Sequence, residues 1–211
     1  MSPQSPSRTN PELARFDAEA SQGLTGVLAG VDEAGRGPLA GPVVAAAVIV
    51  KNPVFSARID DSKKLSPARR EAAFKEILSK CRVASAMVEC GRIDEINTYR
   101  ATLEAMTQAV AGLGEVPALV LADGPMRPDA PCPVRQVIGG DAVSLSIAAA
   151  SIVAKVLRDR LMVSYHQRYP NYGFDRHKGY GTAAHLAAIR AHGPCEIHRR
   201  SFEPVLTMVA S

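Results

Sequence analysis

The chain has 211 residues, 46% of them hydrophobic, and 25 Lys and Arg against 21 Asp and Glu give a formal net charge of +4. This length and apolar content fit one domain with a buried core, and they exclude a disulfide-scaffold peptide and a disordered chain. The four cysteines form no CxxC pair and no close Cys/His cluster. That pattern argues against a structural zinc site and predicts free thiols in a reducing compartment.

Residues 1–22 are polar and proline-bearing, and they predict a flexible leader without the apolar segment of a signal peptide. The longest apolar stretch, residues 43–50, is far shorter than the roughly 20 residues that a membrane helix needs. Both observations predict a soluble, cytoplasmic protein with no membrane partner. Nothing in the pattern resembles an exposed apolar seam, so we expect a monomer.

Short β-branched apolar runs alternate with segments of helical periodicity along residues 23–211. Ser66 followed by Pro67 is typical of a helix N-terminus. The order of elements predicts one α/β domain, in which helices flank a central mixed β-sheet and a basic helical region ends the chain. Its last apolar segment, residues 205–210, is expected to pack on the core, with a tethering tail as the alternative. Strands are expected at residues 27–31, 43–50, 83–88, 118–122 and 134–138, and helices at 66–77, 97–110, 142–165 and 182–191.

The charge is unevenly distributed along the chain. Residues 155–200 contain nine Lys and Arg, three Asp and Glu and all five histidines, whereas residues 1–154 contain 16 basic and 17 acidic residues. A basic segment of this kind is typical of a surface that contacts a polyanion. A solvated charged face is the alternative interpretation of the same pattern.

Acidic residues follow apolar strands at three places where glycine comes next or just before: Asp32 with Glu33 in GVDEAGRG, Asp123 in LVLADG, and Asp141 in VIGGDA. One such residue alone is usually a turn or cap residue. Three of them at strand ends, where open α/β sheets bind ligands, predict a site whose converging carboxylates need a cation. Oxygen ligands without His or Cys favour Mg²⁺ or Mn²⁺ over zinc.

The adjacent acidic residues Asp32 and Glu33 raise a geometric question. Neighbouring side chains on a regular strand point to opposite faces. Both can therefore ligate one metal only if the backbone bends there, or if Glu33 contributes its carbonyl oxygen.

The glycine-rich stretch GVDEAGRGPLAGPVVAAAV, residues 30–48, resembles the N-terminal signature of the ribonuclease HII family. The resemblance covers roughly residues 25–203. It departs at Ala122, where the family often has a longer apolar residue, and at Gly139, where it often has lysine. The other matching segments are DSKKLS at 61–66, Asp123-Gly124, Asp141 before SLSIAAASIVAKVLR at 144–158, YPNYGFDRHKGYGT at 169–182, and HRRSF at 198–202.

The resemblance implies a ribonuclease H-like fold and an endonuclease that uses Mg²⁺ or Mn²⁺, with two ions during catalysis. Such enzymes cleave the RNA strand of RNA–DNA hybrids. They also nick duplex DNA on the 5′ side of a single embedded ribonucleotide, leaving 3′-hydroxyl and 5′-phosphate ends, a reaction of ribonucleotide excision repair. Carried over by motif, the catalytic and metal-binding residues are Asp32, Glu33, Asp123 and Asp141.

The resemblance also implies how the substrate is recognised. The 2′-hydroxyl that distinguishes RNA from DNA is expected to be read by the backbone of Gly35, Arg36 and Gly37 together with Tyr180. His177 and His185 could shuttle protons, but a polar surface role is the favoured interpretation. The expected phosphate contacts are Lys63, Lys64, Lys155, Lys178 and Arg199.

Two other classes of protein remain as alternatives. An integrase or resolvase with a ribonuclease H fold also has carboxylates at strand ends, but it needs no reader for a 2′-hydroxyl. A non-catalytic hybrid-binding protein would keep the basic segment, but acidic residues facing phosphates would weaken its binding.

Overall fold

The structure, a computed structural model, describes residues 11–210. Its centre is a five-stranded sheet in the order β3-β2-β1-β4-β5. β1 pairs antiparallel with β2, which pairs antiparallel with β3, whereas β1, β4 and β5 run parallel. This mixed sheet confirms the predicted fold class. The strands are β1 (Leu28–Ala34), β2 (Val43–Ile49), β3 (Arg82–Val88), β4 (Leu119–Asp123) and β5 (Val134–Val137).

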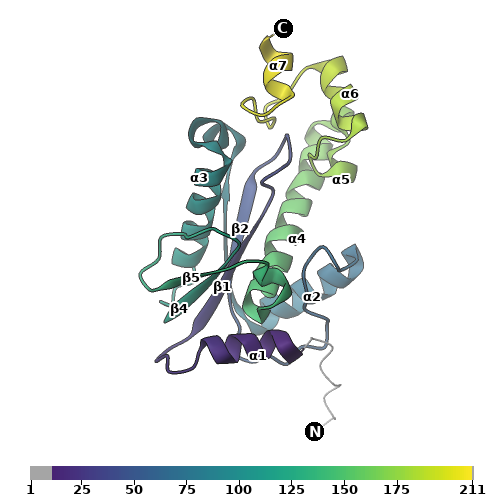
Figure 1. The fold of residues 1–211 in the computed structure, drawn as a ribbon. Helices are drawn as coiled ribbons and strands as arrows, with labels where there is room; N and C mark the ends of the chain where they lie inside the picture. The colour runs from purple at the N-terminus through teal and green to yellow at the C-terminus, as the bar shows by residue number, and fades with distance from the viewer. Residues whose placement is uncertain (1–10, 211) are drawn as a thin grey trace.

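Helices cover both faces of the sheet (Figure 1). α4 (Leu145–Arg168) and α2 (Pro67–Lys80) enclose one apolar core against β2, and α3 (Cys90–Ala111) encloses a second core on the opposite face. The small residues of α4 allow a close approach to the sheet. A Cβ built on Gly30 of β1 would lie only 2.3 Å from the backbone carbon of Ser146, so helix and strand touch there.

Helix α3 begins earlier than the expected start at residue 97. Its helical path is interrupted at Asn97, which has a positive φ of 69°. The Asn97 side chain accepts a hydrogen bond from the Arg100 N–H at 3.1 Å and so begins the second helical part. Asparagine tolerates this conformation better than most residues. The first part, residues 90–96, is too short to show helical periodicity.

The chain ends in a group of short helices at one end of the molecule (Figure 1). Val205 is fully buried beside Leu39, Met162 and Phe174, so the start of the final helix packs on the body of the protein as expected. The elements of this region are η2 (Pro170–Tyr172), α5 (Phe174–His177), α6 (Ala183–His192) and α7 (Val205–Ala210).

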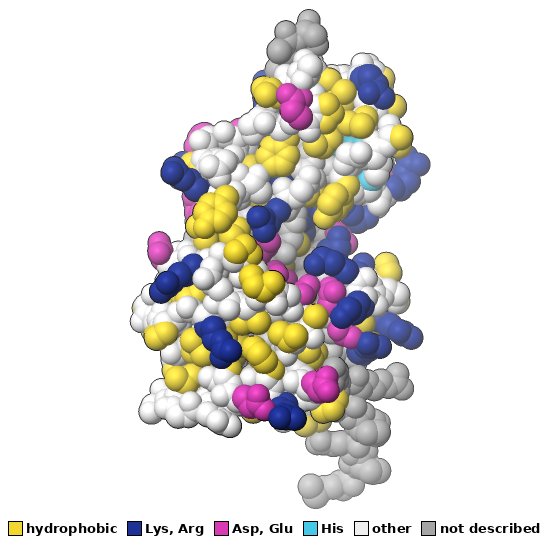
Figure 2. Space-filling view, viewed as in Figure 1, with side chains coloured by type: hydrophobic (Ala, Val, Ile, Leu, Met, Phe, Trp, Pro, Cys, Tyr) yellow, Lys and Arg dark blue, Asp and Glu magenta, His cyan; other side chains and the backbone are white. Residues whose placement is uncertain are grey.

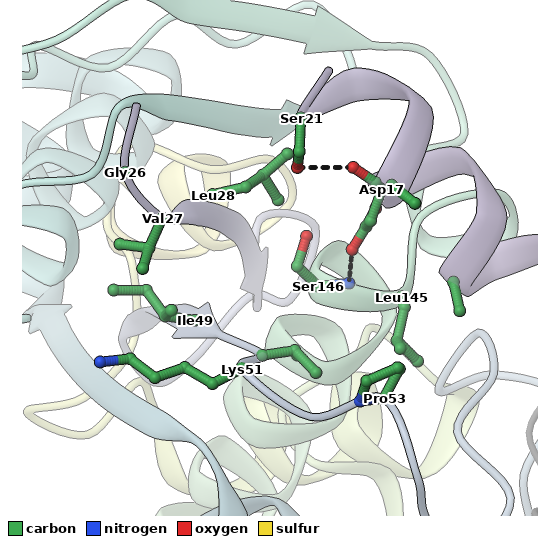
Figure 3. Close-up of a pocket in the computed structure, with 13 residues that line it drawn as sticks. Asp17, Ser21, Gly26, Val27, Leu28, Ile49, Lys51, Pro53, Leu145 and Ser146 are labelled. Carbon is green, nitrogen blue, oxygen red and sulfur yellow. Dashed lines mark hydrogen bonds between the residues drawn. The ribbon is translucent and has the colours of Figure 1, made fainter. Parts of the chain in front are cut away.

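The prediction of a flexible leader over residues 1–22 is wrong in the part that the structure describes. Residues Pro11–Ala20 form helix α1, which buries Leu13 in the core between α2 and α4. Asp17 accepts a hydrogen bond from the Ser144 hydroxyl. It also accepts one, at 2.8 Å, from the Ser146 N–H at the start of α4 (Figure 3). The contact escapes sequence patterning because it joins residues more than 120 positions apart. Residues 1–10 lie outside the described residues.

Within residues 11–210, none of the helices combines the length and the hydropathy that crossing a bilayer requires.

Replacing Asp17 with alanine should lower the free energy of unfolding by about 1 kcal/mol, because the first turn of α4 loses an acceptor for its N–H groups. Urea denaturation measures this. Asp17→Asn retains one amide oxygen and should lose less. Glu19→Ala on the exposed side of the same helix is the matched control. A stability of Asp17→Ala equal to that of the wild type would contradict a docking role for α1.

Candidate active site

The predicted acidic residues come together at one edge of the sheet. β1 and β4 are parallel neighbours, and their register pairs Val31 with Ala122. Asp32 and Asp123, the next residue on each strand, therefore lie side by side. Parallel strands that end at the same edge are the reason two distant sequence motifs meet.

Asp141 reaches the same place through the short helix η1 (Gly140–Ala142) that follows β5. The Gly140 N–H donates to Asp123 Oδ1 at 2.6 Å, and the Asp141 N–H donates to the same oxygen at 3.4 Å. Gly139 before this helix has a positive φ of 64°, a conformation that favours glycine over the lysine often found there. Asp123 thus fixes the turn that carries Asp141.

A pocket of about 330 Å³ opens between the sheet edge and the C-terminal region. In the space-filling view, acidic side chains lie among basic ones in a hollow at mid-height (Figure 2). Ser62, Ser151 and Arg158 line the pocket although the sequence did not single them out. The predicted site residues that line it are Asp32, Glu33, Asp123, Gly35, Arg36, Gly37, Lys63, Lys155 and Tyr180.

The carboxylates of this pocket are desolvated and repel one another. Asp32 is only 5% exposed, and burial raises its pKa well above the usual range, with Glu33 and Asp123 adding to the effect. Burial also raises the pKa of Glu33 and of Asp123. Arg36 opposes the shift at Glu33, to which its Nη1 is 3.4 Å distant. None of the basic residues that line the pocket, Arg36, Lys63, Lys155 and Arg158, donates a hydrogen bond to Glu33 Oε2.

Asp32 and Glu33 both line the pocket, although they are neighbours on β1. Glu33 donates its N–H to Asp32 Oδ1 at 2.7 Å. Its own Oε2 is buried and has no hydrogen-bond partner among residues 11–210. A buried carboxylate oxygen without a donor is a position suited to a cation.

The residues present fit a divalent cation by their chemistry. They offer hard carboxylate oxygens, and Glu33 Oε2 has no hydrogen-bond partner among residues 11–210. Within the described chain, however, no three His, Cys, Asp or Glu side chains are arranged so that they could hold a metal ion. Lys63 Nζ instead lies 3.2 Å from Asp141 Oδ2. A cation at Asp141 would have to displace this ammonium group.

The glycine-rich loop and Tyr180 face each other across the pocket. A Cβ built on Gly37 would lie 4.0 Å from Tyr180 Cε1. The Tyr180 side chain is 47% exposed, so it is an accessible group rather than a core tyrosine. Gly35 has a positive φ of 100°, and a Cβ there would come within 2.0 Å of Arg158 Nε. Only glycine fits at position 35.

Three predicted phosphate contacts do not line the pocket. Lys64 is exposed and lies 3.8 Å from Asp60 Oδ1. The Lys178 ammonium donates to the carbonyl of Asp175. Arg199 is fully buried, and its guanidinium donates to the carbonyls of Gly35, Arg36 and Gly41, which contradicts a direct contact with phosphate. Sequence alone does not distinguish a buried arginine from an exposed one.

Within residues 11–210, no histidine lines the pocket. His185 and His198 are buried, with their Nε2 atoms 3.0 Å apart. His198 Nδ1 accepts the Cys195 N–H, and His185 Nδ1 faces the Tyr180 carbonyl at 3.0 Å. These partners assign the Nε2 proton to His198, which donates to His185. Neither the surface role nor the proton-shuttle role expected for His185 agrees with this burial.

A sequence model of the family described as Ribonuclease HII matches residues 29–205. The ribonuclease HII of Azorhizobium caulinodans is 58% identical over 178 residues, which are 84% of this chain and 69% of that protein. The solved structure of ribonuclease H2 from Pyrococcus horikoshii OT3 superposes with a TM-score of 0.74 at 26% identity, covering 86% of this chain and 96% of that chain. Bst-RNase HIII in complex with Mn²⁺ shares the fold, with a TM-score of 0.64 at 19% identity over 95% of this chain and 73% of that chain.

The buried histidine pair predicts a loss of stability in weak acid. Burial lowers the pKa of His185 and of His198 to about 4. The unfolded chain takes up protons at about pH 6.5 and the folded chain only near pH 4, so stability is present above 6.5 and is lost as the pH falls through this window. From pH 7 to pH 5 we expect a loss on the order of 1 kcal/mol for each histidine, measured by urea denaturation.

His198→Gln should show a smaller loss over that range. The exposed His192→Gln is the matched control and should follow the wild type. Identical pH dependence in all three proteins would contradict a neutral buried pair.

Proposed function

Because the chain belongs to the ribonuclease HII family and is an endoribonuclease, we propose that it hydrolyses the RNA strand of RNA–DNA hybrids and nicks duplex DNA 5′ of single embedded ribonucleotides. One observation carries this proposal. The carboxylates of Asp32, Glu33 and Asp123 line the same pocket as the glycine-rich loop and Tyr180. Carboxylates that can hold metal ions for phosphodiester hydrolysis thus lie beside groups that can recognise a sugar.

Asp32, Glu33, Asp123 and Asp141 would hold divalent cations, Mg²⁺ or Mn²⁺, in this site. When bound, two such ions supply stabilisation for the charge that develops on the attacking and leaving oxygens of a phosphodiester. The four carboxylates are proposed to fix the ions. Hydrolysis in this geometry would leave 3′-hydroxyl and 5′-phosphate ends.

Lys63 and Lys155 are the phosphate contacts that the pocket supports. Both side chains line it, and Lys63 Nζ already sits beside Asp141. Once that carboxylate has another cation partner, the Lys63 ammonium becomes available for a phosphate oxygen. Lys64 and Lys178 stay candidates for phosphates farther along the duplex, because both lie outside the pocket.

Substrate choice would depend on the 2′-hydroxyl, which can both donate and accept a hydrogen bond. The backbone of Gly35, Arg36 and Gly37 can approach a sugar closely because two of these residues have no side chain. Tyr180 offers a phenol and a ring face that can pack on the neighbouring sugar. A duplex of DNA alone gives these groups no hydroxyl to bind.

We extend the proposal to the setting of the reaction. We propose that the protein acts as a monomer. The four cysteines are free, which suits a reducing cytoplasm where ribonucleotide excision repair would use this activity. The basic C-terminal region would lie along the nucleic acid.

The direct test is a duplex that carries one ribonucleotide, incubated with the protein in Mg²⁺ and, in parallel, in EDTA. We expect a nick on the 5′ side of the ribonucleotide in Mg²⁺ alone. Cleavage of an all-DNA duplex would favour an integrase or resolvase, and binding without a nick in Mg²⁺ or Mn²⁺ would favour a hybrid-binding protein. Either outcome would contradict the proposal.

Replacing Tyr180 with alanine should lower the rate of nicking at a lone ribonucleotide by at least about tenfold. The hydrogen bond between the phenol and the 2′-hydroxyl and the packing of the ring on the sugar are lost together. Duplex affinity, measured by fluorescence anisotropy in EDTA, should change much less. Tyr99→Ala is the matched control, since Tyr99 is similarly exposed but lies on α3. Equal losses of nicking and affinity in Tyr180→Ala would exclude a recognition role.

A further inference from the structure

Two buried arginines lie beneath the glycine-rich loop. Arg158 of α4 is 1% exposed and Arg199 is 0% exposed. Neither forms an ion pair with a carboxylate in the described part of the chain. A buried charge without a counter-ion is expensive unless its donors are all satisfied. Neutral acceptors must therefore satisfy the donors of both guanidinium groups.

Their partners are the carbonyl oxygens of the loop at residues 35–42. Each guanidinium donates to three separate carbonyls. One of these carbonyls, that of Lys178, lies outside the loop in the HKGY segment, residues 177–180. Arg199 donates to the carbonyls of Gly35, Arg36 (2.8 Å) and Gly41 (3.0 Å), and Arg158 donates to those of Ala40, Pro42 and Lys178 (each 3.0 Å).

These contacts also fix the direction of the loop's N–H groups. In a trans peptide the carbonyl and the following N–H point in opposite directions. The carbonyls of Gly35 and Arg36 turn inward to Arg199, so the N–H groups of Arg36 and Gly37 turn outward. Neither N–H donates to an acceptor within residues 11–210. Both residues line the pocket, so their donors are free for a ligand there.

We propose that Arg158 and Arg199 are positioning residues for ribonucleotide recognition, which hold the loop at residues 35–42 so that the N–H groups of Arg36 and Gly37 face the 2′-hydroxyl of the substrate. This inference rests on the proposed function. The carbonyl of Lys178 extends the same restraint to the turn that carries Tyr180. Arg158 of α4 thus holds both the loop and the turn that carries Tyr180, and Arg199 of the C-terminal segment holds the loop.

Lysine cannot replace either arginine in this role. A guanidinium presents five N–H donors in a rigid plane, whereas an ammonium presents three donors from a single atom. One ammonium cannot reach three carbonyls that approach a guanidinium from different sides. The loop is also fitted to the arginines, since a Cβ on Gly41 would lie 3.3 Å from Arg158 Nη2 and 2.3 Å from Met162 Sδ.

The test measures discrimination in the Mg²⁺ nicking assay. The readout is the Ki of an all-DNA duplex as competitor divided by the KM of the same duplex with one ribonucleotide. This ratio does not depend on the fraction of active protein, so partial unfolding leaves it unchanged. Arg199→Lys and Arg158→Lys should each lower it by about tenfold, the effect of one misplaced hydrogen bond. The controls Arg200→Lys and Arg160→Lys change exposed neighbours on the same segments and should match the wild type.

A wild-type ratio in both Arg199→Lys and Arg158→Lys would overturn the proposal, as would a ratio near one in the wild type. Arg158 and Arg199 hold the loop from different elements. If one of the two variants does not fold, the other still tests the proposal. A wild-type protein that fails to nick the ribonucleotide duplex at all would instead contradict the proposed function.

Discussion

The crowding of buried carboxylates at the ends of β1 and β4 is the constraint on which the rest of the structure depends. Asp32, Glu33 and Asp123 lie in one pocket, and burial raises the pKa of each. Such a cluster opposes folding unless its charge is neutralised. The only neighbouring cations that the described pocket lining supplies are basic side chains, which leave Glu33 Oε2 without a partner. A cation bound beside Glu33 Oε2 would neutralise part of this charge.

The C-terminal region belongs to the site as much as the sheet does. The Leu39 N–H donates to the Gly179 carbonyl at 2.9 Å, and the Gly41 N–H donates to the Ile197 carbonyl at 2.9 Å. In the opposite direction, the Arg199 N–H donates to the Leu39 carbonyl. The loop after β1 is thus held between two segments that lie more than 130 positions away. These hydrogen bonds hold the loop after β1 in a fixed position relative to the carboxylates at the strand ends.

Much of this arrangement could be predicted from the sequence because it depends on local patterns. Short apolar runs located β2, β3, β4 and β5 to within one residue at each end and β1 to within three, Ser66 with Pro67 marked the start of α2, and Asp32 with Asp123 followed from strand ends. The predictions that failed concern contacts between residues far apart in the sequence. The burial of Arg199 and the docking of Asp17 on α4 depend on partners far along the chain, which no local pattern reveals. The first part of α3, residues 90–96, was missed because it is too short to show helical periodicity.

The most direct test of the carboxylate cluster is the melting temperature of the wild type and of Asp32→Asn, each in EDTA and in Mn²⁺. We predict that Asp32→Asn melts higher than the wild type in EDTA, because a buried repelling charge is removed. Each 1 kcal/mol gained corresponds to about 2–4 °C in a chain of this size. Mn²⁺ should raise the Tm of the wild type and have little effect on the variant, with the exposed Asp129→Asn behaving as the wild type. A lower Tm for Asp32→Asn in EDTA, or equal stabilisation of both proteins by Mn²⁺, would contradict the cluster's proposed role.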